Sequence, residues 1–201
     1  MADEVARRLV HATGATVPLS HLLAPDLVTW RVVQWFMFVC VVVAVALEYA
    51  RLFVGLDWAI YDRLTREYEQ DNPAGYALYM VGMGLVAAAV GLPGFDTAIA
   101  VPAMLMLAIG DPISGLLGSA DASAVKQTWV LLAMFGVCTL LAAPFVPPAA
   151  AVLGGVAATF ADGVKPTVRG FVVDDNFSIP VFSAVAMWVG VTVLANVTAP
   201  A

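Results

Sequence analysis

Charged residues are scarce in this chain: only 12% of its 201 residues are Asp, Glu, Lys or Arg, whereas 62% are hydrophobic. Soluble domains have about 45–50% apolar residues, and a domain of this size has no core large enough to bury many more. A water-soluble globular fold is therefore excluded. The mean hydropathy of +0.91 indicates instead that a lipid bilayer surrounds much of the chain.

Other scarcities exclude further classes of protein. The two cysteines, Cys40 and Cys138, lie in apolar runs, so neither a disulfide framework nor a zinc site is expected. A net charge of -6 argues against a nucleic-acid partner, which requires a basic patch. The sequence has no G-x-x-x-x-G-K-[ST] motif, which excludes a P-loop kinase. Lysine occurs only at Lys126 and Lys165, and an acidic, lysine-poor composition is typical of salt-adapted organisms.

Long apolar runs are what the sequence has instead. We expect an all-α, polytopic membrane helix bundle, because backbone N–H and C=O groups in lipid must be hydrogen-bonded within the structure. The ten-residue alternating segments of a membrane β-barrel are absent. Residues 1–201 are expected to form a single integral-membrane domain with about seven transmembrane helices. The seven apolar segments are 9–24, 32–52, 74–92, 97–117, 128–146, 148–163 and 178–197.

The basic residues are distributed unequally between the loops. With the N-terminus inside, eight of the nine fall on the cytoplasmic side and only Arg31 on the other. Such an excess of Lys and Arg on one side sets the orientation of a membrane protein. We therefore expect a multi-pass protein of the cell membrane, with its N-terminus inside and its C-terminus outside. The eight residues are Arg7, Arg8, Arg51, Arg63, Arg66, Lys126, Lys165 and Arg169.

A carboxylate at the end of a membrane helix is the first candidate for chemistry. Asp111 in "AIGDPISGLLG" lies near the inner end of the fourth segment, where an unpaired charge is costly and indicates function. Pairing with Arg8 or Lys126 is the structural alternative. Small residues also recur in this motif at i, i+4 and i+8, which favours close packing of helices. They are Gly110, Ser114 and Gly118.

Three oxygen-rich side chains precede the last segment. Asp174, Asp175 and Asn176 in "VVDDNFSIP" lie at or just before a helix N-terminus. One aspartate can be an N-cap, but the three together are better explained by Mg²⁺, which takes one or two carboxylates plus phosphate oxygens. Asp162 in "ATFADGVKP" lies at the inner end of the sixth segment, and Lys165 follows it.

The N-terminal stretch and the second apolar segment add polar residues on the same side. On a helix over "DEVARRLVHATG", Glu4, Arg8 and His11 share a face. Glu48 is another costly carboxylate, which we expect to pair with Arg51. Acids for a divalent metal, bases for phosphates and an apolar bundle for a lipid tail together predict phosphoryl chemistry on a lipid at the cytoplasmic face.

Five motifs, in order along nearly the whole chain, resemble those of the CTP-dependent lipid kinases. They are "RRLVHATG", "EYAR", "TREYEQDNPAGYALY", "GDPISGLLG" and "DDNFSIP". This family comprises dolichol kinase, phytol kinase and the CTP-dependent type of diacylglycerol kinase, and the chain looks most like an archaeal dolichol kinase-like protein. The resemblance implies a Mg²⁺-dependent membrane transferase. It would transfer the γ-phosphate of CTP to the hydroxyl of an isoprenoid alcohol such as dolichol.

We expect these residues to have three roles: binding the metal ion, accepting the proton of the alcohol and binding the nucleotide. Asp111 and Asp175 are expected to bind Mg²⁺, with Asp174 and Asn176 as further ligands or orienting groups. The proton of the alcohol would go to a carboxylate, Asp174 or Asp162. The predicted catalytic residues are therefore Asp111, Asp162, Asp174, Asp175 and Asn176. The residues expected to bind the nucleotide are Arg8, His11, Lys126 and Lys165.

Two alternatives remain open. Lipid cytidylyltransferases, which make a CDP-lipid from CTP, also have an acidic motif before the last helix, but usually as Asp-Arg-x-Asp, where this chain has "VDDNFS". The kinase family usually carries a Lys-Ser-x-Glu-Gly motif after its Gly-Asp helix, of which this chain keeps only Lys126 and Thr128. The second alternative is therefore a non-catalytic membrane protein that has lost kinase activity.

Overall fold

The computed structural model describes residues 2–55, 58, 69, 72–118, 126–164, 167–168 and 171–198, with side chains for all but 2–7, 167–168, 171–172 and 195–198. Nearly all of this part of the chain is helical, so the expected helical class is confirmed. In chain order the elements are α1 (Ala2–Thr13), α2 (Thr16–Leu23), α3 (Trp30–Tyr49), the π-helix η1 (Ala50–Val54), α5 (Gly75–Ala89), α6 (Thr97–Leu105), the π-helix η3 (Met106–Gly110), α7 (Asp111–Leu117), α8 (Thr128–Ala142), α9 (Pro148–Gly163), the antiparallel two-residue strands β1 (Thr167–Val168) and β2 (Phe171–Val172), and α10 (Asp175–Thr198).

Among the described residues, three helical stretches are long and apolar enough to cross a membrane. Trp30–Val54, Thr97–Leu117 and Asp175–Leu194 have mean hydropathies of 2.2, 1.7 and 2.0. A hydrocarbon layer of about 30 Å needs roughly 20 helical residues, a length that each of these stretches reaches. Two further apolar helices, α5 and α8, are shorter. Length and composition therefore support a membrane protein.

The stretch Thr97–Leu117, formed by α6, η3 and α7, is the innermost helix of the bundle. Of its most apolar window 72% is buried, against 17% for the window of Trp30–Val54. Its start is capped by Asp96, whose carboxylate accepts the backbone N–H of Ala98 at 2.9 Å. Because other helices surround this stretch, polar groups at its far end need not contact lipid.

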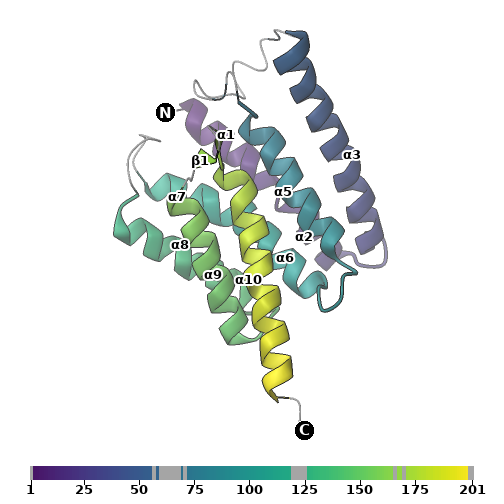
Figure 1. The fold of residues 1–201 in the computed structure, drawn as a ribbon, viewed down its shortest axis with the longest axis vertical. Coiled ribbons are helices and arrows are strands. Elements are labelled where there is room, and N and C mark those ends of the chain that lie inside the picture. Colours follow the sequence, from purple (N-terminus) through teal and green to yellow (C-terminus); the bar gives the residue numbers. More distant parts are fainter. Residues whose placement is uncertain are drawn as a thin grey trace.

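The last helix, α10, packs against α9, α5 and α6, and its first turn lies at the end of the molecule where α1 lies (Figure 1). Glycines allow the close approach. A Cβ on Gly82 of α5 would lie 2.9 Å from the carbonyl oxygen of Asn176, and one on Gly154 of α9 would lie 2.6 Å from Cγ of Met187. Small residues at such crossings let helix backbones come together. They hold the beginning of α10 close to α5 and its middle close to α9.

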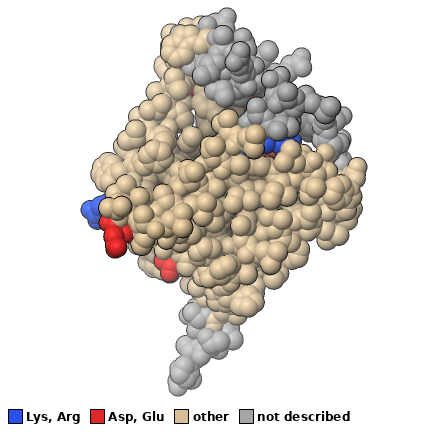
Figure 2. Space-filling view, turned by 180° about the vertical axis from the view of Figure 1, so that it is seen from behind, with Lys and Arg blue, Asp and Glu red and all other residues tan. Residues whose placement is uncertain are grey.

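Helix α3 presents a wide apolar surface to the outside. Trp35, Phe36 and Phe38 are each more than half exposed, and α3 packs mainly against α5. Figure 2 shows that the described part of one face is almost without charge, with a few charged residues at its margins. Large exposed apolar patches are rare on soluble monomers and are expected where a helix contacts lipid.

The predicted segments differ from the helices in detail. The first, 9–24, is two helices, because the chain turns at Gly14, where a Cβ would lie 1.7 Å from the hydroxyl oxygen of Tyr79. Segments 74–92 and 128–146 end early, at Ala89 and Ala142, because each run continues into a turn rich in Gly or Pro.

The described residues bear on only part of two further predictions, the close packing along Gly110, Ser114 and Gly118 and the orientation in the membrane from the basic residues. A Cβ on Gly110 would lie 2.9 Å from Sγ of Cys138, so close packing is confirmed there. Among the described residues, a Cβ on Gly118 would meet only carbonyl oxygens of α7 within 4 Å, so packing against another helix is not confirmed at that position. Several of the basic side chains used for the orientation lie outside the described residues, so the orientation stays a prediction. These are Arg7, Arg63, Arg66, Lys165 and Arg169.

Candidate functional site

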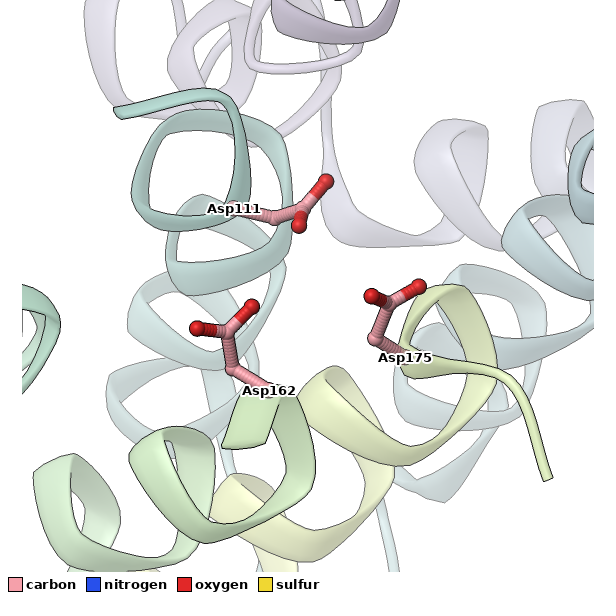
Figure 3. Close-up of side chains that lie close together, drawn as sticks. All are labelled: Asp111, Asp162 and Asp175. Carbon is pink, nitrogen blue, oxygen red and sulfur yellow. The ribbon is translucent and has the colours of Figure 1, made fainter. Parts of the chain in front are cut away.

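Three aspartates that are far apart in the sequence meet at one end of the bundle. Asp111 begins α7, Asp162 lies in the last turn of α9, and Asp175 begins α10. One carboxylate oxygen from each lies within 4.8 Å of those of the other two, and the side chains point toward a common space (Figure 3). We call these three residues the aspartate cluster. Asp162 and Asp175 are buried and Asp111 is partly buried.

Asp174 is the N-cap of α10. Its Oδ1 accepts the backbone N–H of Asn176 at 3.0 Å and the side-chain Nδ2 of Asn176 at 2.5 Å. Its carbonyl oxygen accepts the N–H groups of Phe177 and Ser178. These bonds satisfy N–H groups that a helix start leaves unpaired. They also place the carboxylate of Asp175 in the first turn, where the helix dipole favours negative charge.

Asp162 is held by two residues from other helices and loops. Its Oδ1 accepts from Nζ of Lys126 at 2.5 Å, and its Oδ2 accepts from the hydroxyl of Ser114 at 2.6 Å. Lys126 also donates to Oγ of Ser114 at 3.0 Å. Ser114 and Asp162 are completely buried. Ser114 lies one turn after Asp111 on α7, so α7 both contributes to the cluster and orients the carboxylate that comes from α9.

Asp111 follows a π-helical turn, η3, whose hydrogen bonding explains the position of His11. The N–H of Asp111 bonds to the carbonyl of Met106, and Pro112 has no N–H to offer the next carbonyl, that of Leu107. Nε2 of His11 is the donor to this carbonyl instead. It lies 3.1 Å from the Leu107 oxygen and 3.5 Å from Oδ2 of Asp111. Since a carbonyl oxygen only accepts, Nε2 carries a proton. Such π-turns are frequent at functional sites.

Tyr79 of α5 supports His11 from the other side. The two rings meet edge to face with centroids 4.5 Å apart, and the Tyr79 hydroxyl donates to the His11 carbonyl oxygen at 3.3 Å. The hydroxyl occupies the space that a side chain on Gly14 would need. The turn between α1 and α2 is thereby fixed against α5, and the imidazole of His11 is fixed beside Asp111.

The guanidinium of Arg8 lies against α7 at Gly115, one helical turn beyond Asp111. A Cβ on Gly115 would lie 1.2 Å from Nη1 of Arg8 and 2.2 Å from its Cζ. Only glycine at position 115 therefore admits the guanidinium. The positive charges of Arg8 and Lys126 both act on the Asp111 carboxylate, so the two predicted phosphate-binding cations that the structure describes flank the aspartate cluster.

The electrostatics of the cluster favour a multivalent cation. Two unit negative charges 4.8 Å apart repel by about 3 to 4 kcal/mol at an effective dielectric constant of about 20. The carboxylates of Asp175 and Asp162 both repel a negative charge on Asp111. Carboxylate oxygens are hard ligands, which Mg²⁺ and similar ions prefer. The donor set therefore fits a hard divalent cation.

A second group of polar side chains joins α3 to α5. Glu48 accepts from Arg51 at 2.5 and 3.2 Å, from the Tyr76 hydroxyl at 2.6 Å and from the backbone N–H of Ala74 at 2.7 Å. The predicted Glu48–Arg51 pair is confirmed. Arg51 also donates to the carbonyl of Asn72 at 2.7 Å. Because both ends of the pair are nearly buried, the group fixes the beginning of α5.

The structure assembles most of the predicted site residues. It brings Asp111, Asp162 and Asp175 together and sets Arg8, His11 and Lys126 around them. Asp174 and Asn176 form the cap beside the cluster, and their catalytic roles stay predictions. Lys165 lies outside the described residues.

Sequence reasoning missed three buried side chains near these residues. Ser114 was interpreted only as a packing residue, although its place three residues after Asp111 puts both on one helix face. Tyr79 was seen only as part of a motif. Glu69 is buried, and a Cβ on Gly75 would lie 3.3 Å from its Oε1 and 2.9 Å from Nδ2 of Asn176. No spacing in the sequence indicates that Glu69 lies near the start of α10.

No family model matches the sequence, and no curated protein or solved structure matches the chain. Membership of the CTP-dependent lipid kinase family therefore stays a prediction from the five motifs.

Proposed function

We propose that this protein is a membrane lipid kinase that transfers the γ-phosphate of a nucleotide, CTP in the first instance, to the hydroxyl of an isoprenoid alcohol of the polyprenol or dolichol class. The observation that carries the proposal is the meeting of Asp111, Asp162 and Asp175 within 4.8 Å. The rest of the proposal comes from the five motifs and from the apolar surface of the bundle.

The three carboxylates of the aspartate cluster are oxygen ligands of the kind that Mg²⁺ prefers. When bound, Mg²⁺ would neutralise charge on the phosphate groups, which is the main requirement of phosphoryl transfer. Asp111 and Asp175 are the proposed ligands. The cap of α10 fixes the backbone that carries Asp175, and the carboxylate of Asp111 lies beside the His11 imidazole. The chain thus brings both carboxylates together before any ligand arrives, as positioning catalysis requires.

The cations around the cluster are the proposed phosphate-binding groups. Arg8 fits on α7 in the gap at Gly115, and Lys126 lies two residues before α8. Arginine binds phosphate through its planar fork and lysine as a point charge. The apolar outer surface near these helix ends would hold the tail of the alcohol, with its hydroxyl at the membrane interface.

The proposed arrangement in the membrane has about seven spans, with the N-terminus in the cytoplasm and the C-terminus outside. In support, α1 and the start of α10 lie at one end of the molecule and α10 ends at the other (Figure 1). The active site would then face the cytoplasm, where CTP is found. Labelling of single cysteines, introduced at each end, by an impermeant reagent in intact cells tests this orientation.

The decisive assay uses purified protein in detergent with Mg²⁺, labelled CTP or ATP, and dolichol, geranylgeraniol or diacylglycerol as acceptor. We expect a lipid monophosphate with an isoprenoid alcohol and a loss of product of at least about 100-fold in Asp111→Asn and Asp175→Asn, the scale seen when electrostatic stabilisation of a transition state is removed. Asp26→Asn, at an exposed position outside the cluster, is the matched control.

Other products would point to other functions. A CDP-lipid formed with release of pyrophosphate would identify a cytidylyltransferase. Absence of both product and Mg²⁺-nucleotide binding would identify a non-catalytic protein. Unchanged phosphorylation in both Asp111→Asn and Asp175→Asn would refute the assignment of the site.

A further inference from the structure

We propose that the ammonium group of Lys126 is a built-in occupant of the aspartate cluster, which a divalent cation displaces from Asp162 when it binds. The inference rests on the proposed function in one respect, that the cluster holds such a cation, and it adds Asp162 to the proposed ligands Asp111 and Asp175. It adds an order of events: the cation enters first, and the lysine it releases then becomes available to the phosphate groups of the nucleotide.

Both oxygens of Asp162 are in use in the structure. Oδ1 accepts from Lys126 and Oδ2 accepts from Ser114. An ion held by all three aspartates must take an oxygen of Asp162. If it takes Oδ1, it lies next to the ammonium of Lys126, and two cations on one carboxylate oxygen repel each other. The structure therefore represents a state in which Lys126 supplies positive charge to the cluster.

The three partners differ in how firmly they are held. Ser114 and Asp162 belong to α7 and α9 and are completely buried, whereas Lys126 precedes α8 and its side chain is 21% exposed. Exchange of the ammonium for a divalent cation therefore needs movement of one partly exposed side chain. Ser114 keeps its bond to Oδ2, so it is a positioning residue that orients Asp162 in both states.

The exchange also explains why a lysine occurs here in a chain that has only two. Arg8, the other Lys or Arg that the described residues place beside the cluster, lies in a gap on α7 that Gly115 leaves. A lysine is a compact charge on a flexible stem and can move between a carboxylate and a phosphate, whereas the larger planar fork of arginine is suited to a fixed site. Lys126 thus couples the binding of the cation to the binding of phosphate.

The two lysines make a direct test possible. Purified protein in detergent is treated with an amine-acylating reagent in EDTA or with increasing Mn²⁺, and peptides containing Lys126 and Lys165 are quantified by mass spectrometry. Lys165, the other lysine in the sequence, reports any general change in reactivity. We expect acylation of Lys126 to be slow in EDTA and to rise at least about fivefold as Mn²⁺ binds, relative to Lys165.

Two variants sharpen the result. In Asp111→Asn/Asp175→Asn, Mn²⁺ should leave the acylation of Lys126 unchanged, because the cation no longer binds. Lys126→Met should bind Mn²⁺ about tenfold more tightly than the wild type, measured by the loss of the free Mn²⁺ spin-resonance signal, since about 1.4 kcal/mol of competition is then removed.

Two results overturn the proposal in the wild-type protein, whatever the variants do. One is Mn²⁺ binding with no rise in Lys126 acylation, and the other is no Mn²⁺ binding at millimolar concentration. The kinase proposal is judged separately, by phosphorylation of the lipid with Mg²⁺ and nucleotide added together, because a nucleotide can bring its own cation.

Discussion

Arg8 and Gly115 should depend on each other, because the guanidinium fills the space of a side chain at position 115. A Cβ there would lie 1.2 Å from Nη1 of Arg8, so Gly115→Ala must drive Arg8 off α7. Gly136 of α8 is the matched control, because no atom of the described residues lies within 4 Å of a Cβ at that position. Both glycines lie within helices, so the change in backbone freedom is the same in both.

The expected magnitudes follow from this geometry. Replacing a helical glycine by alanine stabilises by about 0.5–1 kcal/mol, and Gly136→Ala should show this gain. Gly115→Ala should show none of it, because the guanidinium gives up its position. In the Arg8→Ala background the gain at Gly115 should return. The coupling energy is then about 1 kcal/mol, in the range for residues in contact, and chemical unfolding of the single and double variants in detergent measures it.

An equal effect of Gly115→Ala with and without Arg8 would refute this reasoning. The phosphotransfer rate gives a second comparison. Gly115→Ala and Arg8→Ala should lower the rate by similar factors, and the double variant should be no slower than either single variant, because all three lack the charge at the same place.

Three further predictions concern stability. Asp111→Asn should raise the unfolding free energy in EDTA by on the order of 1 kcal/mol, because it relieves repulsion between carboxylates. We expect Mg²⁺ to raise the Tm of the wild type but not that of the variant. An equal rise in both proteins would contradict this prediction. Glu48→Ala should cost about 3 kcal/mol, because it leaves Arg51 buried without its carboxylate, and adding Arg51→Ala should recover part of the loss in a double-mutant cycle; full additivity would show that the two do not act as a pair. Gly14→Ala should cost about 1–3 kcal/mol by overpacking against the Tyr79 hydroxyl, and less in a Tyr79→Phe background, as unfolding in detergent would show; equal costs would contradict the contact.

The acidic residues of the site could be found from the sequence because an apolar bundle makes them conspicuous. In a chain with 12% charged residues, a carboxylate at a helix end has few structural explanations. Asp111, Asp162 and Asp175 were identified on that basis, and the structure places them together. The Glu48–Arg51 pair was predictable as well, because residues three apart on a helix are neighbours.

The contacts between helices could not be predicted in the same way. The bond from Ser114 to Asp162 depends on how α7 crosses α9, and no periodicity within one helix encodes a crossing. The small-residue row was interpreted as a packing surface, which holds at Gly110 but not at Ser114, whose hydroxyl serves the site. The π-turn before Asp111 depends on a local choice of hydrogen bonds, for which Pro112 was the only visible signal.

The aspartate cluster is difficult to explain by folding alone. A structural ion pair in this bundle needs one carboxylate for one cation, as in the group of Glu48 and Arg51. Lys126 and Ser114 already satisfy both oxygens of Asp162, so bringing Asp111 and Asp175 within 4.8 Å adds a repulsion that the positive charges of Arg8 and Lys126 offset only in part. Arrangements that lower stability in this way are typical of functional sites, where activity rather than folding selects them. A cation bound between the three carboxylates would remove the repulsion, and their hard oxygen donors suit a divalent cation such as the Mg²⁺ that we propose.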